Sequence, residues 1–297
     1  MNITFLGTGA AELNPNPFCH CIHCETARKL IAEGKFKPRK RTATMLGSKV
    51  MMDFGPDVMA ASMDYSAPMT ELEDVFITHT HEDHFCFSNI NVLSMTKEPL
   101  GQPVNFHLSP QGHKWVMDMI ETTSKLYNPV MAMKTLIDDG FVKFNVITPY
   151  ETNMIGGMEV YAVQSNHMSY GEGEYSLNYR LTLENGKKLF YVTDSGLYSE
   201  ENLKILEGSE CDCLIMEGTR GLRETPEHFS HLNGELFCKN VKNFIKHGII
   251  KENAAVYATH IATSPEFFTS DEAYQQYLNE NCGGVPVLTY DGLKVEL

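Results

Sequence analysis

The stretch Thr78-His79-Thr80-His81-Glu82-Asp83-His84 places three imidazoles and a carboxylate within six positions, directly after the apolar run Val75-Phe76-Ile77. Four metal-ligand side chains this close together diverge in direction, so one small ion cannot bind all of them. They suit two adjacent ions, with the first two histidines on one and the final Asp-His pair on the other. Paired divalent cations of this kind activate water and bind the reacting oxygens. The stretch therefore predicts a two-metal hydrolytic site at the end of a strand.

The composition is that of an ordinary globular protein, with 297 residues, 42% of them hydrophobic and 21% charged. The opening Met1-Asn2-Ile3-Thr4-Phe5-Leu6 lacks the basic region of a signal peptide, and no apolar segment approaches the ~20 residues of a membrane span. No membrane partner is expected.

The net charge of −14 disfavours a broad nucleic-acid-binding face, because phosphate backbones attract Lys and Arg. A small phosphorylated substrate is compatible with this charge if a local basic patch binds it. One such patch lies at residues 35–41, and a solvated loop explains it equally well. Its members are Lys35, Lys37, Arg39, Lys40 and Arg41.

Three of the eight cysteines fall in Cys19-His20-Cys21-Ile22-His23-Cys24. This spacing indicates metal ligation in a reducing compartment rather than a disulfide scaffold, so a cytoplasmic location is expected. Three thiolates leave a tetrahedral zinc site one ligand short, and three reduced cysteines without metal are the alternative. The remaining cysteines are expected to be small buried hydrophobic residues: Cys86, Cys211, Cys213, Cys238 and Cys282.

Apolar runs and turn signals predict a mixed α/β chain. Residues 3–6 form an expected first strand, and a hairpin is expected over 44–53. Asn185-Gly186 between two β-rich runs is a stronger hairpin signal. No linker divides the chain, so we expect one domain, 1–297, with a layered α/β sandwich. The other predicted strands are 72–78, 141–147, 158–164, 213–216 and 255–258, and the predicted helices are 109–126 and 233–247.

Three more metal-ligand side chains follow apolar, β-rich runs: His167, Asp194 and His260. Each of them alone is more often a cap or a hydrogen-bonded core residue. Because loops at strand ends commonly carry the functional residues of layered α/β folds, all three are expected to project towards the edge that holds the histidine cluster.

Together these motifs resemble the metallo-β-lactamase fold superfamily, from Gly7-Thr8-Gly9 through Asp53-Phe54-Gly55 to His260. The resemblance covers almost the whole chain and implies a four-layer αββα sandwich with the site at one edge of the two sheets. It also implies a ligand set: His79, His81 and His167 for metal one, Asp83, His84 and His260 for metal two, and Asp194 as the bridge.

Asp194 at the bridging position resembles the phosphodiesterases, ribonucleases and glyoxalase-II-like hydrolases, because true β-lactamases usually carry Cys or Ser there. Cys19-x-Cys21-x-x-Cys24 is similar to the structural zinc knot of a subgroup that includes the carbon–phosphorus lyase pathway cyclic phosphodiesterase and a pyrroloquinoline quinone biosynthesis protein. In that phosphodiesterase a fourth ligand is expected three residues past the last active-site histidine, where this chain has Thr263. The fourth ligand is therefore open among His20, His23, His228 and another cysteine.

Glu217-Gly218-Thr219 and His231-Leu232-Asn233 look like the acid–histidine pair of the tRNA 3′-processing ribonuclease. The likeness implies that His231, oriented by Glu217, protonates the leaving oxygen. A role for His231 as a helix cap or as a simple hydrogen-bond partner explains the pattern equally well. The long basic arm with which that ribonuclease grips tRNA is not visible in the sequence, which disfavours a nucleic-acid substrate.

The expected activity is hydrolysis of a small or cyclic nucleotide-like phosphodiester. Two Zn or Mn ions would hold the attacking hydroxide, Asp83 and Asp194 would orient it, and Arg39 and Arg41 would bind the phosphate. The ligand types do not choose between the metals. Thioester or lactone hydrolysis, tRNA 3′ processing and a non-hydrolytic role in cofactor biosynthesis are the alternatives. A homodimer is compatible with the sequence.

Overall fold

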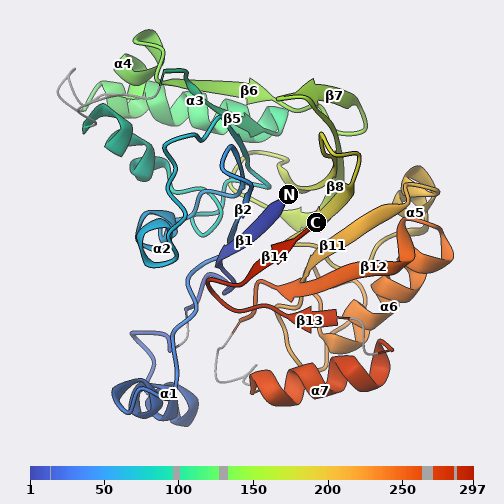
Figure 1. Cartoon of the computed structure of the whole chain (residues 1–297). Helices are drawn as coiled ribbons and strands as arrows, with labels where there is room; N and C mark the ends of the chain where they lie inside the picture. The colour runs from blue at the N-terminus through green and yellow to red at the C-terminus, as the bar shows by residue number, and fades with distance from the viewer. Residues whose placement is uncertain (14, 96–100, 127–132, 263–269, 284–285) are drawn as a thin grey trace.

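Two mixed β-sheets lie face to face in the computed structural model, with helices on both outer sides (Figure 1). The structure describes residues 1–13, 15–95, 101–126, 133–262, 270–283 and 286–297. The predicted αββα sandwich is confirmed. None of the described helices is long and apolar enough to cross a membrane.

The first sheet has the strand order β14-β1-β2-β3-β4-β5-β6. Its pairings are antiparallel from β14 to β3 and parallel from β3 to β6. The strands are β1 (Asn2–Gly7), β2 (Ala43–Leu46), β3 (Val50–Met52), β4 (Asp74–Phe76), β5 (Val104–Leu108), β6 (Val142–Val146) and β14 (Lys294–Glu296). The connections carry α1 (Ile22–Ala32), α2 (Val58–Asp64), the 3₁₀ segment η1 (Phe87–Met95), α3 (Pro110–Ser124) and α4 (Met133–Asp138).

The second sheet repeats this scheme, in the order β13-β12-β11-β10-β9-β8-β7. Its pairings are antiparallel from β7 to β10 and parallel from β10 to β13. The strands are β7 (Thr152–Ile155), β8 (Met158–Met168), β9 (Tyr175–Thr182), β10 (Lys188–Val192), β11 (Cys211–Glu217), β12 (Ile250–Thr259) and β13 (Pro286–Leu288). The helices on this side are α5 (Glu200–Leu206), α6 (Gly234–Lys246) and α7 (Asp271–Asn281).

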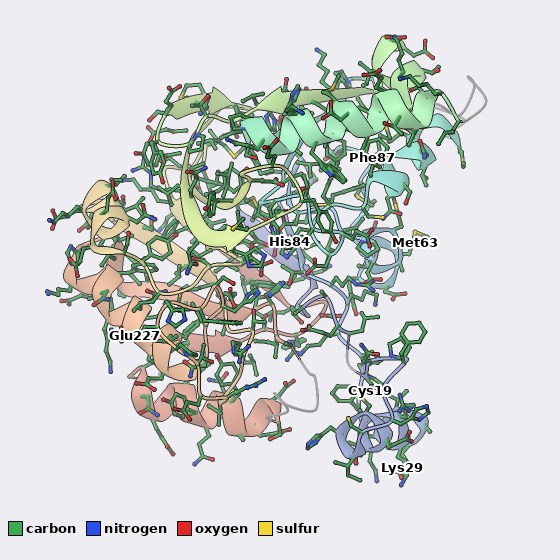
Figure 2. The ribbon with its side chains drawn as sticks, turned by 180° about the vertical axis from the view of Figure 1, so that it is seen from behind. Cys19, Lys29, Met63, His84, Phe87 and Glu227 are labelled. Atoms are coloured by element: carbon green, nitrogen blue, oxygen red, sulfur yellow. The ribbon has the colours of Figure 1, made fainter. Side chains whose placement is uncertain are left out.

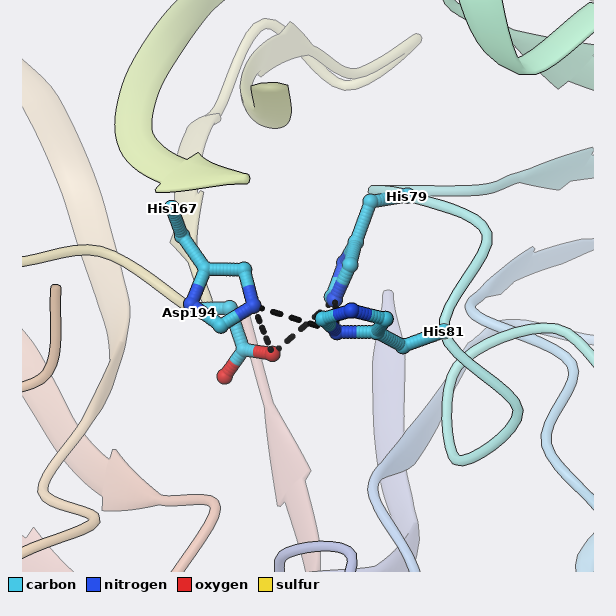
Figure 3. Close-up of side chains that lie close together, drawn as sticks. All are labelled: His79, His81, His167 and Asp194. Carbon is cyan, nitrogen blue, oxygen red and sulfur yellow. Dashed lines mark hydrogen bonds and ion pairs between the residues drawn. The ribbon is translucent and has the colours of Figure 1, made fainter. Parts of the chain in front are cut away.

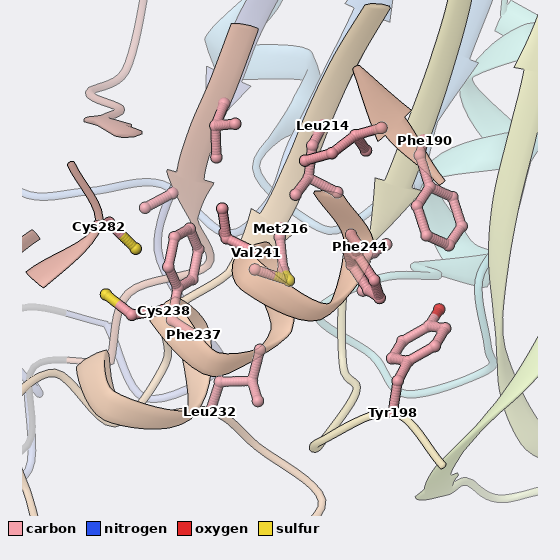
Figure 4. Close-up of a cluster of buried hydrophobic side chains, with 14 of the residues drawn as sticks. Phe190, Tyr198, Leu214, Met216, Leu232, Phe237, Cys238, Val241, Phe244 and Cys282 are labelled. Atoms are coloured by element: carbon pink, nitrogen blue, oxygen red, sulfur yellow. The ribbon is translucent and has the colours of Figure 1, made fainter. Parts of the chain in front are cut away.

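Alternation along the strands divides the apolar side chains between two layers, because successive residues of a strand point to opposite faces. In β10, Leu189 and Tyr191 belong to the core between the sheets, whereas Phe190 and Val192 belong to the core under the helices. Figure 4 shows Phe190 beside Phe244 of α6, and the centroids of these two rings are 5.6 Å apart. At this strand, both faces of the second sheet are therefore covered by apolar side chains.

The predicted hairpins and long helices are confirmed. The Asn185-Gly186 turn joins β9 to β10, and Gly186 has a φ of +77°, which glycine adopts without strain. Ser109 caps α3 by accepting the backbone N–H of Gly112 at 2.9 Å. Helix α6 lies between the caps Asn233 and His247, as the sequence indicated.

Other predictions need correction. The strand expected over 72–78 is only β4, since the chain beyond Phe76 turns into the histidine loop. His167 lies inside β8 rather than after it, at a register shift between Gln164 and Met168. Four of the cysteines expected in the core are buried there, but Cys86 is partly exposed because it follows the histidine loop into solvent.

Candidate metal centre

The seven predicted ligand side chains meet at one edge of the sandwich. One group sits on the loop that follows β4 of the first sheet, and the other on β8 and on the loops after β10 and β12 of the second sheet. Figure 2 shows His84 near the middle of the view, where the two halves of the molecule meet. All are buried except the partly exposed His81. The residues are His79, His81, Asp83, His84, His167, Asp194 and His260.

A first cluster joins His79, His81, His167 and Asp194 (Figure 3). Nδ1 of His81 lies 3.0 Å from Nε2 of His79 and 3.2 Å from Nε2 of His167. Oδ2 of Asp194 lies 3.1 Å from Nε2 of His79 and 3.6 Å from Nε2 of His167. Four ligand atoms around a tetrahedral zinc ion would be about 3.3 Å apart at ordinary bond lengths. The cluster therefore has the dimensions of a metal site.

A second cluster joins Asp83, His84, Asp194 and His260. Nε2 of His84 lies 3.1 Å from Nε2 of His260, 3.3 Å from Oδ2 of Asp83 and 3.1 Å from Oδ2 of Asp194. Oδ1 of Asp194 lies 3.3 Å from Nε2 of His260 and is buried without a hydrogen-bond partner. A buried carboxylate oxygen of this kind calls for a cation. The two clusters share Asp194 and fit a dinuclear metal site.

The backbone is strained at three residues of this centre. Asp53, Asp194 and His260 have φ values of 62°, 49° and 56°, in the left-handed region that residues with side chains rarely adopt. Such strain persists only where the surrounding structure enforces it, and it gathers at functional sites. Because a left-handed φ turns the side chain away from the direction that it would have in a strand, the position of a residue at a strand end does not by itself give the direction of its side chain.

Hydrogen bonds behind the ligands fix their orientation. Asp53 is fully buried, and its Oδ2 lies 2.9 Å from Nδ1 of His84. Oγ1 of Thr219 lies 2.8 Å from Nδ1 of His260, and Oγ1 of Thr78 lies 3.0 Å from Nδ1 of His79. These contacts leave each Nε2 to face the centre, as metal-binding histidines require. The sequence contained Asp53 and Thr219 within quoted motifs, but their role was not predicted.

The electrostatics of the first cluster suit metal binding. Burial and the neighbouring His84 hold the pKa of His79 well below its usual value, and burial lowers the pKa of His167 to about 4. Burial would raise the pKa of Asp194, but His260 and His84 outweigh it and hold that pKa well below its usual value. The lone pairs of these groups are therefore available to a cation.

His231 and Glu217 lie beside the second cluster. Nδ1 of His231 is 2.9 Å from Oε1 of Glu217 and 3.6 Å from Oδ1 of Asp194. Glu217 is fully buried and also accepts backbone N–H groups from Ser195, at 2.7 Å, and from Leu232, at 3.2 Å. Burial would lower the pKa of His231, but the carboxylates of Glu217 and Asp194 raise it to about 9. The predicted pair is brought together, and neither residue caps α6, because Asn233 does so.

The three thiols of Cys19, Cys21 and Cys24 come together at the start of α1, which stands away from the sheets (Figure 2). Sγ of Cys21 caps the helix by accepting the Cys24 N–H at 3.3 Å. Among the described residues no other candidate ligand joins this group. His20 faces solvent with its side chain 93% exposed, and neither His23 nor His228 belongs to the group. Thr263 lies outside the described residues.

The expectation for Arg39 needs correction. Its guanidinium is buried and donates to Oγ1 of Thr8 at 2.6 Å, to the carbonyl of Thr289 at 2.6 Å and to Oδ2 of Asp271 at 2.7 Å. It therefore joins three segments of the fold rather than facing a substrate. Arg41 differs, because it lines the cleft in front of the metal centre while Asp57 holds it at 3.1 Å.

That cleft has a volume of about 740 Å³, within the range of small-molecule sites. His81 and Asp83 form its inner end. The segment Phe85–Ser88 and the side chains of Trp115, Met119 and Tyr170 line its walls, and Glu82 lies at its rim.

Residues 48–260 match the family described as the β-lactamase superfamily domain, and the match covers the histidine loop, Asp194 and His260. The chain belongs to the metallo-β-lactamase fold superfamily. No significant match was found among curated proteins.

Solved structures with this superfamily fold align over the whole chain. Zn²⁺-bound PqqB from Methylobacterium extorquens is 18% identical, with a TM-score of 0.71 and full coverage of both chains. A diphosphatase from the PhnP family is 19% identical, with a TM-score of 0.67, covering 100% of this chain and 97% of its own. The short form of human tRNase Z is 17% identical, with a TM-score of 0.62, covering 100% of this chain and 99% of its own. At these identities the likeness establishes the fold.

Proposed function

We propose that this superfamily member is a metal-dependent phosphodiesterase that acts on a small phosphodiester. The observation that carries the proposal is Asp194, whose carboxylate is shared by two ligand clusters and lies 3.6 Å from His231. A pair of divalent ions with a proton donor beside it suits a reaction that places negative charge on phosphoryl and leaving oxygens.

The protein groups would divide the work as follows. Bound divalent cations would activate water and neutralise charge on the phosphoryl oxygens. Asp194 joins the two clusters through its carboxylate, and Asp83 contributes its carboxylate to the second cluster. Because Nδ1 of His231 is engaged by Glu217, its Nε2 is the atom that would carry the proton for the leaving oxygen. Arg41 supplies positive charge in the cleft.

Two of the structural neighbours support this choice by their names, a diphosphatase and a tRNase, since both act on phosphate esters or anhydrides. The alternative from another functional class is a non-hydrolytic role in cofactor biosynthesis, and the structural likeness to PqqB is the finding that favours it. The ligand chemistry accommodates Zn or Mn. A third metal ion, zinc at the cysteine group, is part of the proposal.

The test is a panel of bis-(p-nitrophenyl) phosphate, a thioester and a lactone, assayed with the full chain loaded with Zn²⁺ or Mn²⁺. We expect turnover of the phosphodiester and loss of at least 10³-fold in the variant His79→Ala, with metal content measured in parallel. Preferred turnover of the thioester or lactone would overturn the phosphodiesterase assignment. No turnover of any substrate by a protein with both metals bound would favour the non-hydrolytic alternative.

A further inference from the structure

The outer part of the cleft is an aromatic wall that ends at the metal centre. The Tyr170 ring meets the ring of His81 edge-on, with centroids 4.8 Å apart. On its other side Tyr170 lies nearly parallel to Trp115, with centroids 6.1 Å apart and an interplanar angle of 30°. Phe87 and Met119 complete this wall, and Arg41 also lines the cleft. The wall thus begins within contact of a candidate metal ligand.

The wall is held in place before any ligand arrives. Tyr170 belongs to a tight loop in which Gly171 N–H donates to Oε2 of Glu174 at 3.0 Å. Glu174 is buried, and the same oxygen accepts Oγ1 of Thr80, the residue between the first two histidines. Its other oxygen touches the start of α3, because a Cβ on Gly112 would lie 2.6 Å from it. One carboxylate therefore hydrogen-bonds both the Tyr170 loop and the histidine loop, and it packs closely against the start of the helix that carries Trp115.

We propose that Trp115 and Tyr170 form a stacking platform for a nucleobase, so that the substrate of the proposed phosphodiesterase is a nucleotide whose phosphate lies at the metals. The inference rests on the proposed function for the position of the phosphate. Two aromatic rings, a phenylalanine and a methionine offer flat apolar faces, and aromatic faces of this kind hold nucleobases by stacking. Only two ring contacts separate Trp115 from His81, which is short enough for one nucleotide to span.

Trp115 is the single tryptophan of the chain, so its fluorescence reports directly on this wall. The experiment titrates the Mn²⁺-loaded full chain with adenosine 5′-monophosphate, ribose 5-phosphate and inorganic phosphate. We expect the nucleotide to quench Trp115 and to bind about tenfold more tightly than ribose 5-phosphate, which is the usual effect of one stacked base. Equal affinities for the two phosphates would overturn the platform.

The variants locate the effect. Tyr170→Leu keeps the reporter and removes one ring from a side chain that is 54% exposed, so folding is not at risk. We expect it to lose about tenfold in nucleotide affinity and a much smaller factor in phosphate affinity, because the phosphate would lie at the metals. Because Trp115→Leu removes the fluorescent reporter, its affinity is measured as the inhibition constant of adenosine 5′-monophosphate against hydrolysis of bis-(p-nitrophenyl) phosphate. Trp115→Leu should raise this constant, and Trp115→Phe should bring it most of the way back to the parent value. Tyr290→Leu, an exposed aromatic residue outside the cleft lining, is the matched control.

Failure of this inference and failure of the proposed function are distinguishable. Hydrolysis of bis-(p-nitrophenyl) phosphate together with equal binding of nucleotide and ribose phosphate overturns the platform alone. Tighter nucleotide binding that Tyr170→Leu abolishes supports the platform, even in a protein that hydrolyses no phosphodiester.

Discussion

Asp53 and His84 form a buried carboxylate–imidazole pair, with Oδ2 of Asp53 2.9 Å from Nδ1 of His84. The other oxygen of Asp53 accepts both the backbone N–H and the hydroxyl of Thr78, at 2.9 and 2.8 Å. Asp53 therefore ties the first residue of the histidine loop to its last. The pair makes His84 present Nε2 to Asp83 and Asp194.

Replacement of Asp53 by Asn should weaken the second metal. The amide would set an N–H against Nδ1 of His84 or lose the contacts to Thr78, so the imidazole would no longer be held. Loss of such a partner typically costs 10–100-fold in metal affinity. Competition with a chromogenic chelator measures it. Tyr191→Phe, which removes a donor 3.3 Å from the same carboxylate, is the control, and an equal loss in both variants would contradict the assignment.

His231→Gln should slow substrates according to their leaving groups. A proton donor contributes 10²- to 10⁴-fold when the departing oxygen is a poor leaving group and little when it is p-nitrophenolate. We expect a large loss of kcat for a nucleoside 2′,3′-cyclic phosphate and a small one for bis-(p-nitrophenyl) phosphate. Glu217→Gln should follow the same order with smaller effects. Equal slowing of both substrates would show that His231 is not the proton donor.

Gly55→Ala should disturb the histidine loop from outside. A Cβ at this position would lie 2.1 Å from the carbonyl oxygen of Asp83, and backbone cannot move aside without shifting the loop. Overpacking of this kind costs about 1–3 kcal/mol in the free energy of unfolding. Urea unfolding of the metal-free protein gives that value. Gly101→Ala, where the new Cβ meets no atom of the described residues within 4 Å, should leave stability unchanged.

Cys21→Ser should remove the zinc ion proposed for the cysteine group and leave the two ions of the metal centre bound. The cysteine group lies at α1, apart from the sheets (Figure 2). Thiolates dominate zinc affinity in such sites, so loss of one of three should abolish binding. Mass spectrometry of metal content should give one ion fewer per chain, with unchanged turnover of bis-(p-nitrophenyl) phosphate. Equal metal content in variant and parent would exclude the cysteine site.

Asp212 should give the protein an acid-dependent stability. Its carboxylate accepts Nζ of Lys251 at 2.7 Å and the backbone N–H of Lys188 at 2.9 Å. Burial opposes them, but these donors lower its pKa below the usual 3.8. The contribution is therefore present above pH 3.8 and is lost as pH falls below it. Urea unfolding of metal-free protein should show a shallower acid decline in Asp212→Asn, and identical slopes would contradict this.

The metal centre could be predicted from the positions of its ligands, because each of them follows an apolar strand or lies at its end, as His260 follows β12. The same reasoning could not predict the role of Asp53, because its partner His84 is 31 positions away. It also could not predict the backbone strain at Asp194, which only tertiary contacts impose. Arg39 was misread for a similar reason. Its carboxylate partner Asp271 is 232 positions later, so the local run of basic residues showed only charge.

Helix α1 was also missed, because the cysteine spacing drew the interpretation towards metal ligation. In the structure Cys21 is both a thiol of that group and the N-cap of the helix. The hairpins and long helices were predictable because their signals are local: a glycine turn, a cap and an apolar period. Contacts between sheets carry no such local signal.

The shared architecture of the two sheets has a mechanical consequence. Each ligand cluster takes residues from both sheets: His79, His81, Asp83 and His84 from the first, and His167, Asp194 and His260 from the second. Each bound ion would therefore link the two sheets. At a free metal concentration of 100 times its dissociation constant, one ion would add about 2.7 kcal/mol to the free energy of unfolding. A chain nicked between β6 and β7 should therefore stay assembled longer with metal than with chelator, so that the bound ions would be part of the scaffold that positions them.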